Sequence, residues 1–205
     1  MGEPFRSFED SWAHFLAREE PLEDFAGGLP ADESARVAVW LIPLDPALAP
    51  RVRDVQGRLP RLDWLRPLPA HFLHVTVESL GFVDDERRVP DLVESCAEAL
   101  LGLPAFRLSF PRLNCFHEAV VAEVEGEGVK EAAARLRADD GPFLPHLSLA
   151  YTSAPGPPGE LRDALVPIRN TNLGEQEVRQ IQLCLVPASR VTILEPWTVA
   201  GTVSL

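Results

Sequence analysis

Basic residues, and lysine above all, are scarce in this chain. Its 205 residues include 19 Lys and Arg against 31 Asp and Glu, which gives a net charge of −12, and Lys130 is the only lysine. Proteins that hold long nucleic acids along the phosphate backbone need a basic stripe to do so. The composition therefore argues against a long nucleic acid as ligand, but it leaves room for a local pocket that holds one nucleotide.

Long apolar runs and paired cysteines are missing as well. No apolar stretch approaches the ~20 residues that a membrane span needs, and the first residues form no apolar leader segment. Cys96, Cys115 and Cys184 are an odd number without paired spacing, and no base stands next to Cys115 in the sequence. We therefore expect a cytoplasmic protein without membrane contact, with reduced cysteines packed in its core.

The rest of the composition is that of an ordinary globular protein, with 46% apolar and 24% charged residues. The length suits one large domain or two small lobes that share a cleft. Apolar periodicity and turn residues predict helices over 5–19, 46–58, 91–101, 129–137 and 160–165. They predict strands over 35–42, 72–80, 106–110, 119–124, 146–152, 178–186 and 197–205, with the last two paired.

The N-terminal segment has its own pattern. Apolar residues recur at helical spacing over 5–19, and Ser7 and Asp10 have the spacing of a capping box. Residues 19–33 are acidic and contain glycine and proline, which predicts a linker. The helix is expected to pack on the body of the protein, with a cap over an active site as the alternative.

One four-residue pattern occurs twice, 72 residues apart, as His74-Val75-Thr76-Val77 and His146-Leu147-Ser148-Leu149. Successive side chains of a strand point to opposite faces, so the histidine and the hydroxyl residue of each motif share a face. Two such strands side by side would present two imidazoles and two hydroxyls to one cleft. This set suits acid–base chemistry on a bound phosphate, with one histidine as base, one as acid, and the hydroxyls on the oxygens.

Two further residues near the motifs are candidates with two interpretations each. Tyr151, the only tyrosine, lies on the face opposite His146 by strict alternation and would then pack in the core. A bulge or the end of the strand would instead return it to the cleft as a substrate contact. Glu78 shares the face of His74 and either orients a histidine or is solvated.

The remaining histidines are weaker candidates. His71 and His74 are spaced as in some zinc sites, but zinc needs three or four ligands and the other candidates are scattered. We expect no metal, with His71 in the loop before the strand. His117 is expected in a turn and His14 on the N-terminal helix, neither with a site role.

The two motifs and their flanks resemble the 2H phosphoesterase superfamily, in particular its bacterial 2′-5′ RNA ligase-like (LigT-like) branch. That family is defined by two His-aliphatic-Ser/Thr-aliphatic motifs. Residues 69–73 and 78–83 around the first motif, and 143–145 before the second, are similar to the family's flanking sequences. The resemblance covers a single domain over 35–205 and leaves 1–34 as an N-terminal helical extension.

The resemblance implies a bilobal α+β fold with an approximate twofold, in which two antiparallel sheets flank a central cleft and helices lie outside. It implies a phosphoesterase without metal or cofactor that cleaves a 2′,3′-cyclic phosphate or a 2′-5′ phosphodiester of a nucleotide or RNA end. His74 and His146 would be catalytic, and Thr76 and Ser148 would bind the phosphate. The pair of histidines predicts a bell-shaped pH profile near neutrality.

The substrate and the chemistry have alternatives. Family members often carry a basic residue five places after each motif histidine, where this chain has Ser79 and Tyr151. Together with the net charge, this favours a small nucleotide or cyclic phosphate over long RNA. The alternatives to the proposed chemistry are a non-catalytic nucleotide-binding module of the same fold and a metal-dependent hydrolase that uses His71, His74 and a carboxylate.

Overall fold

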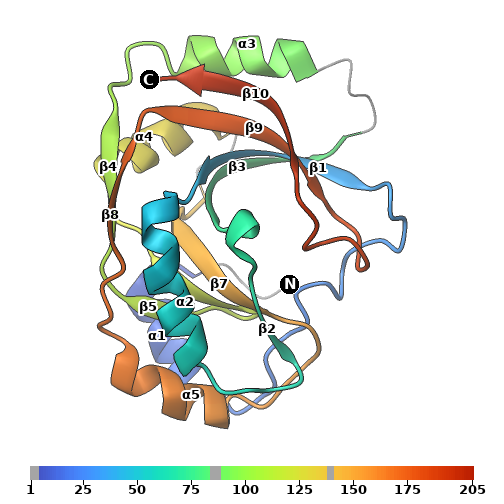
Figure 1. Ribbon diagram of the computed structural model, residues 1–205, viewed down its shortest axis with the longest axis vertical. Helices are drawn as coiled ribbons and strands as arrows, with labels where there is room; N and C mark the ends of the chain where they lie inside the picture. The colour runs from blue at the N-terminus through green and yellow to red at the C-terminus, as the bar shows by residue number, and fades with distance from the viewer. Residues whose placement is uncertain (1–4, 84–88, 138–140) are drawn as a thin grey trace.

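A computed structural model describes residues 5–83, 89–137 and 141–205 of the protein (Figure 1). The helices are α1 (Phe8–Ala17), α2 (Ala49–Arg58), α3 (Val89–Ala99), α4 (Glu127–Leu136) and α5 (Gly159–Leu165). The strands are β1 (Arg36–Pro43), β2 (Leu65–Pro67), β3 (His74–Phe82), β4 (Phe106–Phe110), β5 (Leu113–Cys115), β6 (Ala119–Glu123), β7 (His146–Thr152), β8 (Gly174–Val178), β9 (Gln180–Pro187) and β10 (Thr198–Ser204).

The strands form one eight-stranded antiparallel sheet and one two-stranded sheet. The large sheet has the order β10-β9-β1-β3-β7-β6-β5, with β2 also paired to β7, and β4 pairs with β8. Its two halves meet through a single residue pair, Val75 opposite Leu147. Figure 1 shows the β10-β9-β1-β3 half in the upper part of the molecule and the β7-β6-β5 half in the lower part. The α+β class with antiparallel sheets is confirmed.

Most predicted elements are present, and the predicted pairing of the last two strands is confirmed by the β9–β10 ladder. The pattern missed β2 and β5, which are three residues each, and β8. Strand β8 alternates exposed and buried positions, but the side chain at its buried centre is the polar Gln176. A search for alternating apolar residues therefore passes over it.

The core lies where the apolar faces of these elements meet. Helix α3 packs on β10, α4 on β3 and β4, and α1 on β5. The three cysteines are buried and free, as expected, and burial raises the pKa of Cys96 and of Cys184 to about 12. Within the described ranges, no helix combines the length and the apolar character that crossing a membrane requires.

The N-terminal segment joins both halves of the large sheet. Ser7 caps α1 by accepting a hydrogen bond from the backbone N–H of Asp10 at 3.0 Å, as its spacing predicted. Beyond α1 the backbone N–H of Phe25 donates to the carbonyl of Thr152 at the end of β7 (3.0 Å). The carbonyl of Leu29, four residues after Phe25, accepts a hydrogen bond from the guanidinium of Arg190, which follows β9 (2.9 Å). Residues 19–33, which the sequence predicted to be a linker, are thus hydrogen-bonded to the lower half of the sheet through Phe25 and to the segment after β9 of the upper half through Leu29.

Candidate active site

The single pair that joins the two halves of the sheet brings the two motifs together. Val75 and Leu147 are fully buried, and the residues on either side of them are partly exposed. Extending the antiparallel register by one residue places His74 opposite Ser148 and Thr76 opposite His146. The two histidines lie on one diagonal of this arrangement and the two hydroxyl residues on the other, with diagonal neighbours about 7–8 Å apart. We call His74, Thr76, His146 and Ser148 the junction site.

Both histidines are fixed in the same tautomer by their own backbone. Nδ1 of His74 lies 2.8 Å from the carbonyl oxygen of Phe72, and Nδ1 of His146 lies 2.8 Å from that of Leu144. A carbonyl oxygen only accepts, so each Nδ1 carries a hydrogen and donates it. Nε2 of each ring is therefore the atom that takes up or releases a proton. The two motifs are equivalent in this respect, since each partner is two residues before its histidine.

Aromatic rings pack edge-to-face against both imidazoles. His74 packs against Phe72 (ring centroids 5.5 Å apart) and Trp197 (5.1 Å), and His146 packs against Phe116 (4.8 Å). This burial is the main cause of a pKa of about 4 for His74, which the nearby His146 lowers further. Burial also lowers the pKa of His146. Both rings are therefore neutral at pH 7 in the free protein.

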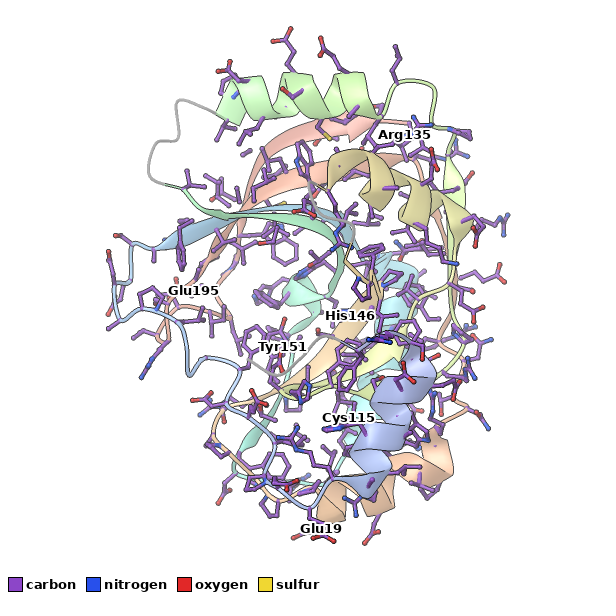
Figure 2. The ribbon with its side chains drawn as sticks, turned by 180° about the vertical axis from the view of Figure 1, so that it is seen from behind. Glu19, Cys115, Arg135, His146, Tyr151 and Glu195 are labelled. Atoms are coloured by element: carbon purple, nitrogen blue, oxygen red, sulfur yellow. The ribbon has the colours of Figure 1, made fainter. Side chains whose placement is uncertain are left out.

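Tyr151 lies on the side of Ser148 because strand β7 contains a bulge. Val120 of β6 pairs with Ala150 and the next residue, Val121, pairs with Ser148, so that Leu149 is an extra residue on β7. A bulge of this kind shifts the alternation by one position. Burial raises the pKa of Tyr151 to about 12, and a side-chain hydrogen bond from Ser148 opposes part of that rise. Figure 2 shows Tyr151 and His146 near the middle of the molecule.

Glu78 and His71 have partners outside the junction site. Nε of Arg137, just after α4, lies 3.5 Å from a carboxylate oxygen of Glu78, and both side chains are largely buried. Glu78 is thus paired with an arginine, which neither interpretation of the sequence had included. His71 is exposed, and its Nε2 lies 3.1 Å from the carbonyl of Leu194. Over the described ranges, no three His, Cys, Asp or Glu side chains group closely enough to hold a metal ion.

The N-terminal extension packs against the loop that covers His146. Phe8 on α1 stacks on Phe116, and Phe5 stacks on His117 with ring centroids 4.6 Å apart. His117 thus lies between two strands, as predicted, and contacts the extension. Phe116 and Trp197 could not be recognised from the sequence because each approaches its histidine only through tertiary packing. Trp197 lies more than 120 residues after His74, and no local signal links them.

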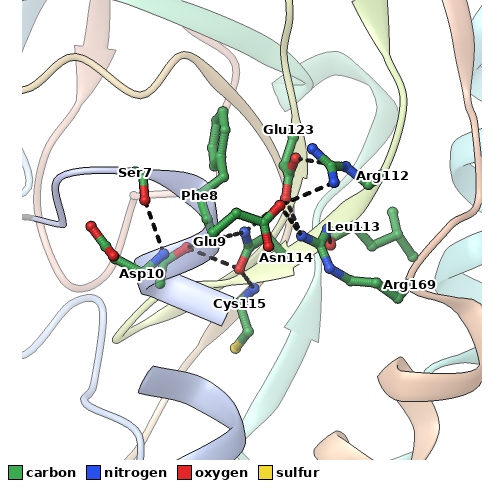
Figure 3. Close-up of polar contacts among 11 residues, drawn as sticks. Ser7, Phe8, Glu9, Asp10, Arg112, Leu113, Asn114, Cys115, Glu123 and Arg169 are labelled. Atoms are coloured by element: carbon green, nitrogen blue, oxygen red, sulfur yellow. Dashed lines mark hydrogen bonds and ion pairs between the residues drawn. The ribbon is translucent and has the colours of Figure 1, made fainter. Parts of the chain in front are cut away.

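A buried polar network supports the strand beside His146 (Figure 3). Glu123 of β6 pairs with His146 across the ladder, and its fully buried carboxylate lies 2.6 Å from the Arg169 guanidinium. The Asn114 amide donates to Glu123 (2.9 Å), and the Ser11 hydroxyl of α1 donates to Asn114 (3.0 Å). The network therefore connects α1 to β5 and to β6, and β6 is the strand that pairs with the second motif.

Comparisons with known proteins identify the class of protein that has this fold and these two facing motifs. A family model described as the 2′-5′ RNA ligase superfamily matches residues 44–190. The chain therefore belongs to this superfamily, and the resemblance to the LigT-like 2H phosphoesterases is confirmed. No curated protein sequence matches the chain significantly.

Solved structures of similar fold cover most of the chain. Apo LigT of E. coli is 19% identical with a TM-score of 0.65, covering 84% of this chain and 98% of its own. TT0787 of Thermus thermophilus is 20% identical with a TM-score of 0.63, covering 82% of this chain and 97% of its own. ATU0111 of Agrobacterium tumefaciens is 14% identical with a TM-score of 0.54, covering 86% of this chain and 94% of its own. At these identities the likeness establishes the fold.

Proposed function

We propose that the protein is a metal-independent phosphoesterase that cleaves a 2′,3′-cyclic phosphate or a 2′-5′ phosphodiester of a nucleotide. The observation that carries this proposal is that the two histidines make the same hydrogen bond to their own backbone. Each donates its Nδ1 hydrogen to a carbonyl two residues earlier, which leaves Nε2 as the atom that exchanges a proton. The strand register places the two histidines and the two hydroxyl residues at opposite corners of one strand pair. Such a set can move two protons around a phosphoryl group without a Lewis acid.

The mechanism follows from the roles that these groups can take. One neutral histidine accepts at Nε2 the proton of a water molecule, or of the free ribose 3′-hydroxyl beside a 2′-5′ linkage, as its oxygen bonds to phosphorus. The other histidine, protonated, gives its Nε2 proton to the ribose oxygen that leaves. Thr76 and Ser148 donate hydrogen bonds to the non-bridging oxygens, where negative charge accumulates in the transition state. One proton enters the pair and one leaves it, so the next turnover begins with the roles exchanged or after exchange with solvent.

Crystal structures of a protein with this fold support a nucleotide as the substrate. E. coli LigT has been crystallised with 3′-AMP (17% identity, TM-score 0.64) and with phosphate (19%, TM-score 0.59). A nucleoside 3′-phosphate and inorganic phosphate are both small anions of the kind that two imidazoles and two hydroxyls would hold.

Turnover in the presence of a chelator tests the proposal. We expect purified protein in EDTA to hydrolyse nucleoside 2′,3′-cyclic phosphates or 2′-5′-linked dinucleotides, because the proposed steps use only side-chain protons. A non-catalytic binding module would bind these compounds without consuming them. Activity lost in EDTA and restored by added zinc, with stoichiometric zinc in the purified protein, would favour the metal-dependent hydrolase.

The pH dependence of kcat/KM should have its maximum below pH 6.5. This parameter reports the free enzyme, whose active form carries one proton on the histidine pair. Burial lowers the pKa of His74 to about 4 and lowers that of His146, so this form is most populated on the acid side of an ordinary histidine. A bound phosphate anion favours imidazolium, so the kcat profile should lie at higher pH.

Parallel profiles of kcat and kcat/KM, measured at constant ionic strength, check this expectation. The structure thus moves the expected optimum of kcat/KM from near neutrality toward acid pH. Superimposable profiles centred at pH 7 or above would contradict it.

A further inference from the structure

A cavity of about 430 Å³ borders Tyr151. Phe25 of the N-terminal extension lines it and stacks on the Tyr151 ring, with centroids 3.6 Å apart and planes 5° apart. Val191 and Leu194, between β9 and β10, line it as well. These three residues lie outside 44–190, the range that the family model matches. Part of this cavity is therefore built by segments outside the range that the family model matches.

Arg66 places a positive charge on this cavity beside Tyr151. The two residues pair directly across the β2–β7 ladder, and directly opposed residues of an antiparallel pair project to the same face. Since the bulge puts Tyr151 on the side of Ser148, Arg66 lies on the face of the junction site. Its side chain is exposed, and within the described part of the chain it forms no ion pair.

Arg190 adds a second positive charge whose partners are neutral. Its Nε and Nη2 donate to the backbone carbonyls of Leu29 (2.9 Å) and Gly27 (2.6 Å), which satisfy hydrogen bonds without cancelling the charge. One carboxylate, that of Asp24, also lines the cavity and accepts from the N–H of Ala26 at 3.0 Å. Two guanidinium groups against one carboxylate make the cavity locally positive in a chain whose net charge is −12.

We propose that this cavity is a subsite for a second phosphate of the substrate, on the 5′ side of the nucleotide whose cyclic phosphate occupies the junction site. The inference rests on the proposed function and narrows its substrate class. Arg66 would bind the 5′-phosphate, because a guanidinium fork matches the oxygens of a phosphate group. Tyr151 connects the two sites, since its hydroxyl end meets Ser148 and its ring lines the cavity.

A pair of substrates that differ only in the 5′ group tests the subsite. We expect wild-type protein to turn over adenosine 2′,3′-cyclic phosphate bearing a 5′-phosphate with a kcat/KM at least roughly tenfold above that of the 5′-hydroxyl form, since hydrogen bonds to charged groups have this strength. Arg66→Gln should bring the ratio of the two values close to one. A wild-type ratio near one, or a ratio that Arg66→Gln leaves unchanged, would overturn the proposal.

Arg61→Gln is the matched control. Arg61 is an exposed arginine five residues before Arg66 and does not line the cavity, so this variant should keep the wild-type ratio. A fall in the ratio equal to that of Arg66→Gln would show that overall charge, and not the cavity, sets the preference.

A binding measurement separates failure of the subsite from failure of the proposed function. If neither cyclic substrate is consumed, the proposed function fails, and calorimetry with adenosine 3′,5′-bisphosphate and adenosine 3′-monophosphate still tests the cavity. Tighter binding of the bisphosphate that Arg66→Gln abolishes supports the subsite. Equal affinities for the two ligands in wild-type protein count against it.

Discussion

Replacing either motif histidine by alanine should reduce turnover of the cyclic phosphate by roughly 10²–10⁴-fold, the usual contribution of a positioned acid or base. His74→Ala and His146→Ala should have similar effects, because both rings present Nε2 through the same hydrogen bond to a carbonyl two residues earlier. Thr76→Ala and Ser148→Ala each remove one hydrogen bond to developing charge and should cost the same or less. Steady-state rates under saturating substrate measure these losses.

His71→Ala provides the control for these variants. His71 is exposed and bonded to the Leu194 carbonyl, outside the junction site, so we expect nearly wild-type turnover. A metal-dependent hydrolase that used His71 as a ligand would instead lose activity with it. Circular dichroism should confirm that each variant folds, and a folded His74→Ala protein with wild-type activity would exclude His74 from the chemistry.

Glu123→Ala should destabilise the protein by about 3–5 kcal/mol, the usual cost of breaking a buried ion pair by removing one partner. The Glu123 carboxylate is fully buried, and Arg169, which is 10% exposed, would lose its partner at 2.6 Å. Asn114 would also lose the acceptor of its amide hydrogen bond. Urea unfolding followed by circular dichroism measures the change as a lower midpoint at similar slope.

Glu125→Ala is the matched control, since Glu125 is an exposed glutamate two residues later in the chain. Its loss should change the free energy of unfolding by no more than about 0.5 kcal/mol. If Glu123→Ala were equally mild, the network around Arg169 would contribute little to stability, and its place behind His146 would need another explanation.

The sequence predicted the motif strands because their pattern is local. Alternation with period two places His74 and Thr76 on one face, and the buried Val75 between them confirms it. Tyr151 could not be placed in this way, since the bulge that turns it depends on pairing with β6.

Glu123 shows a second limit of what can be predicted from the sequence. Within the run Ala119–Glu123, a single glutamate at the end of an apolar strand is typical of a solvent-exposed position. It is buried because two guanidinium groups supply the opposite charge, that of Arg112 at 3.2 Å and that of Arg169, 46 residues later, at 2.6 Å. Phe25 and Trp197 likewise contact Tyr151 and His74 from the two ends of the chain. Pairings at such separations leave no periodic signal in a single sequence.

The N-terminal extension depends on partners that are synthesised much later than the extension itself. Ser11 bonds to a residue 103 positions further on, and the carbonyl of Leu29 accepts from a guanidinium 161 positions further on. At roughly 5–20 residues per second, the ribosome takes on the order of ten seconds to supply the second of these partners. The apolar face of α1, with Phe8, Trp12 and Phe15, meets solvent or chaperones during that interval. The extension therefore reaches these native contacts only after most of the chain that follows it has been synthesised.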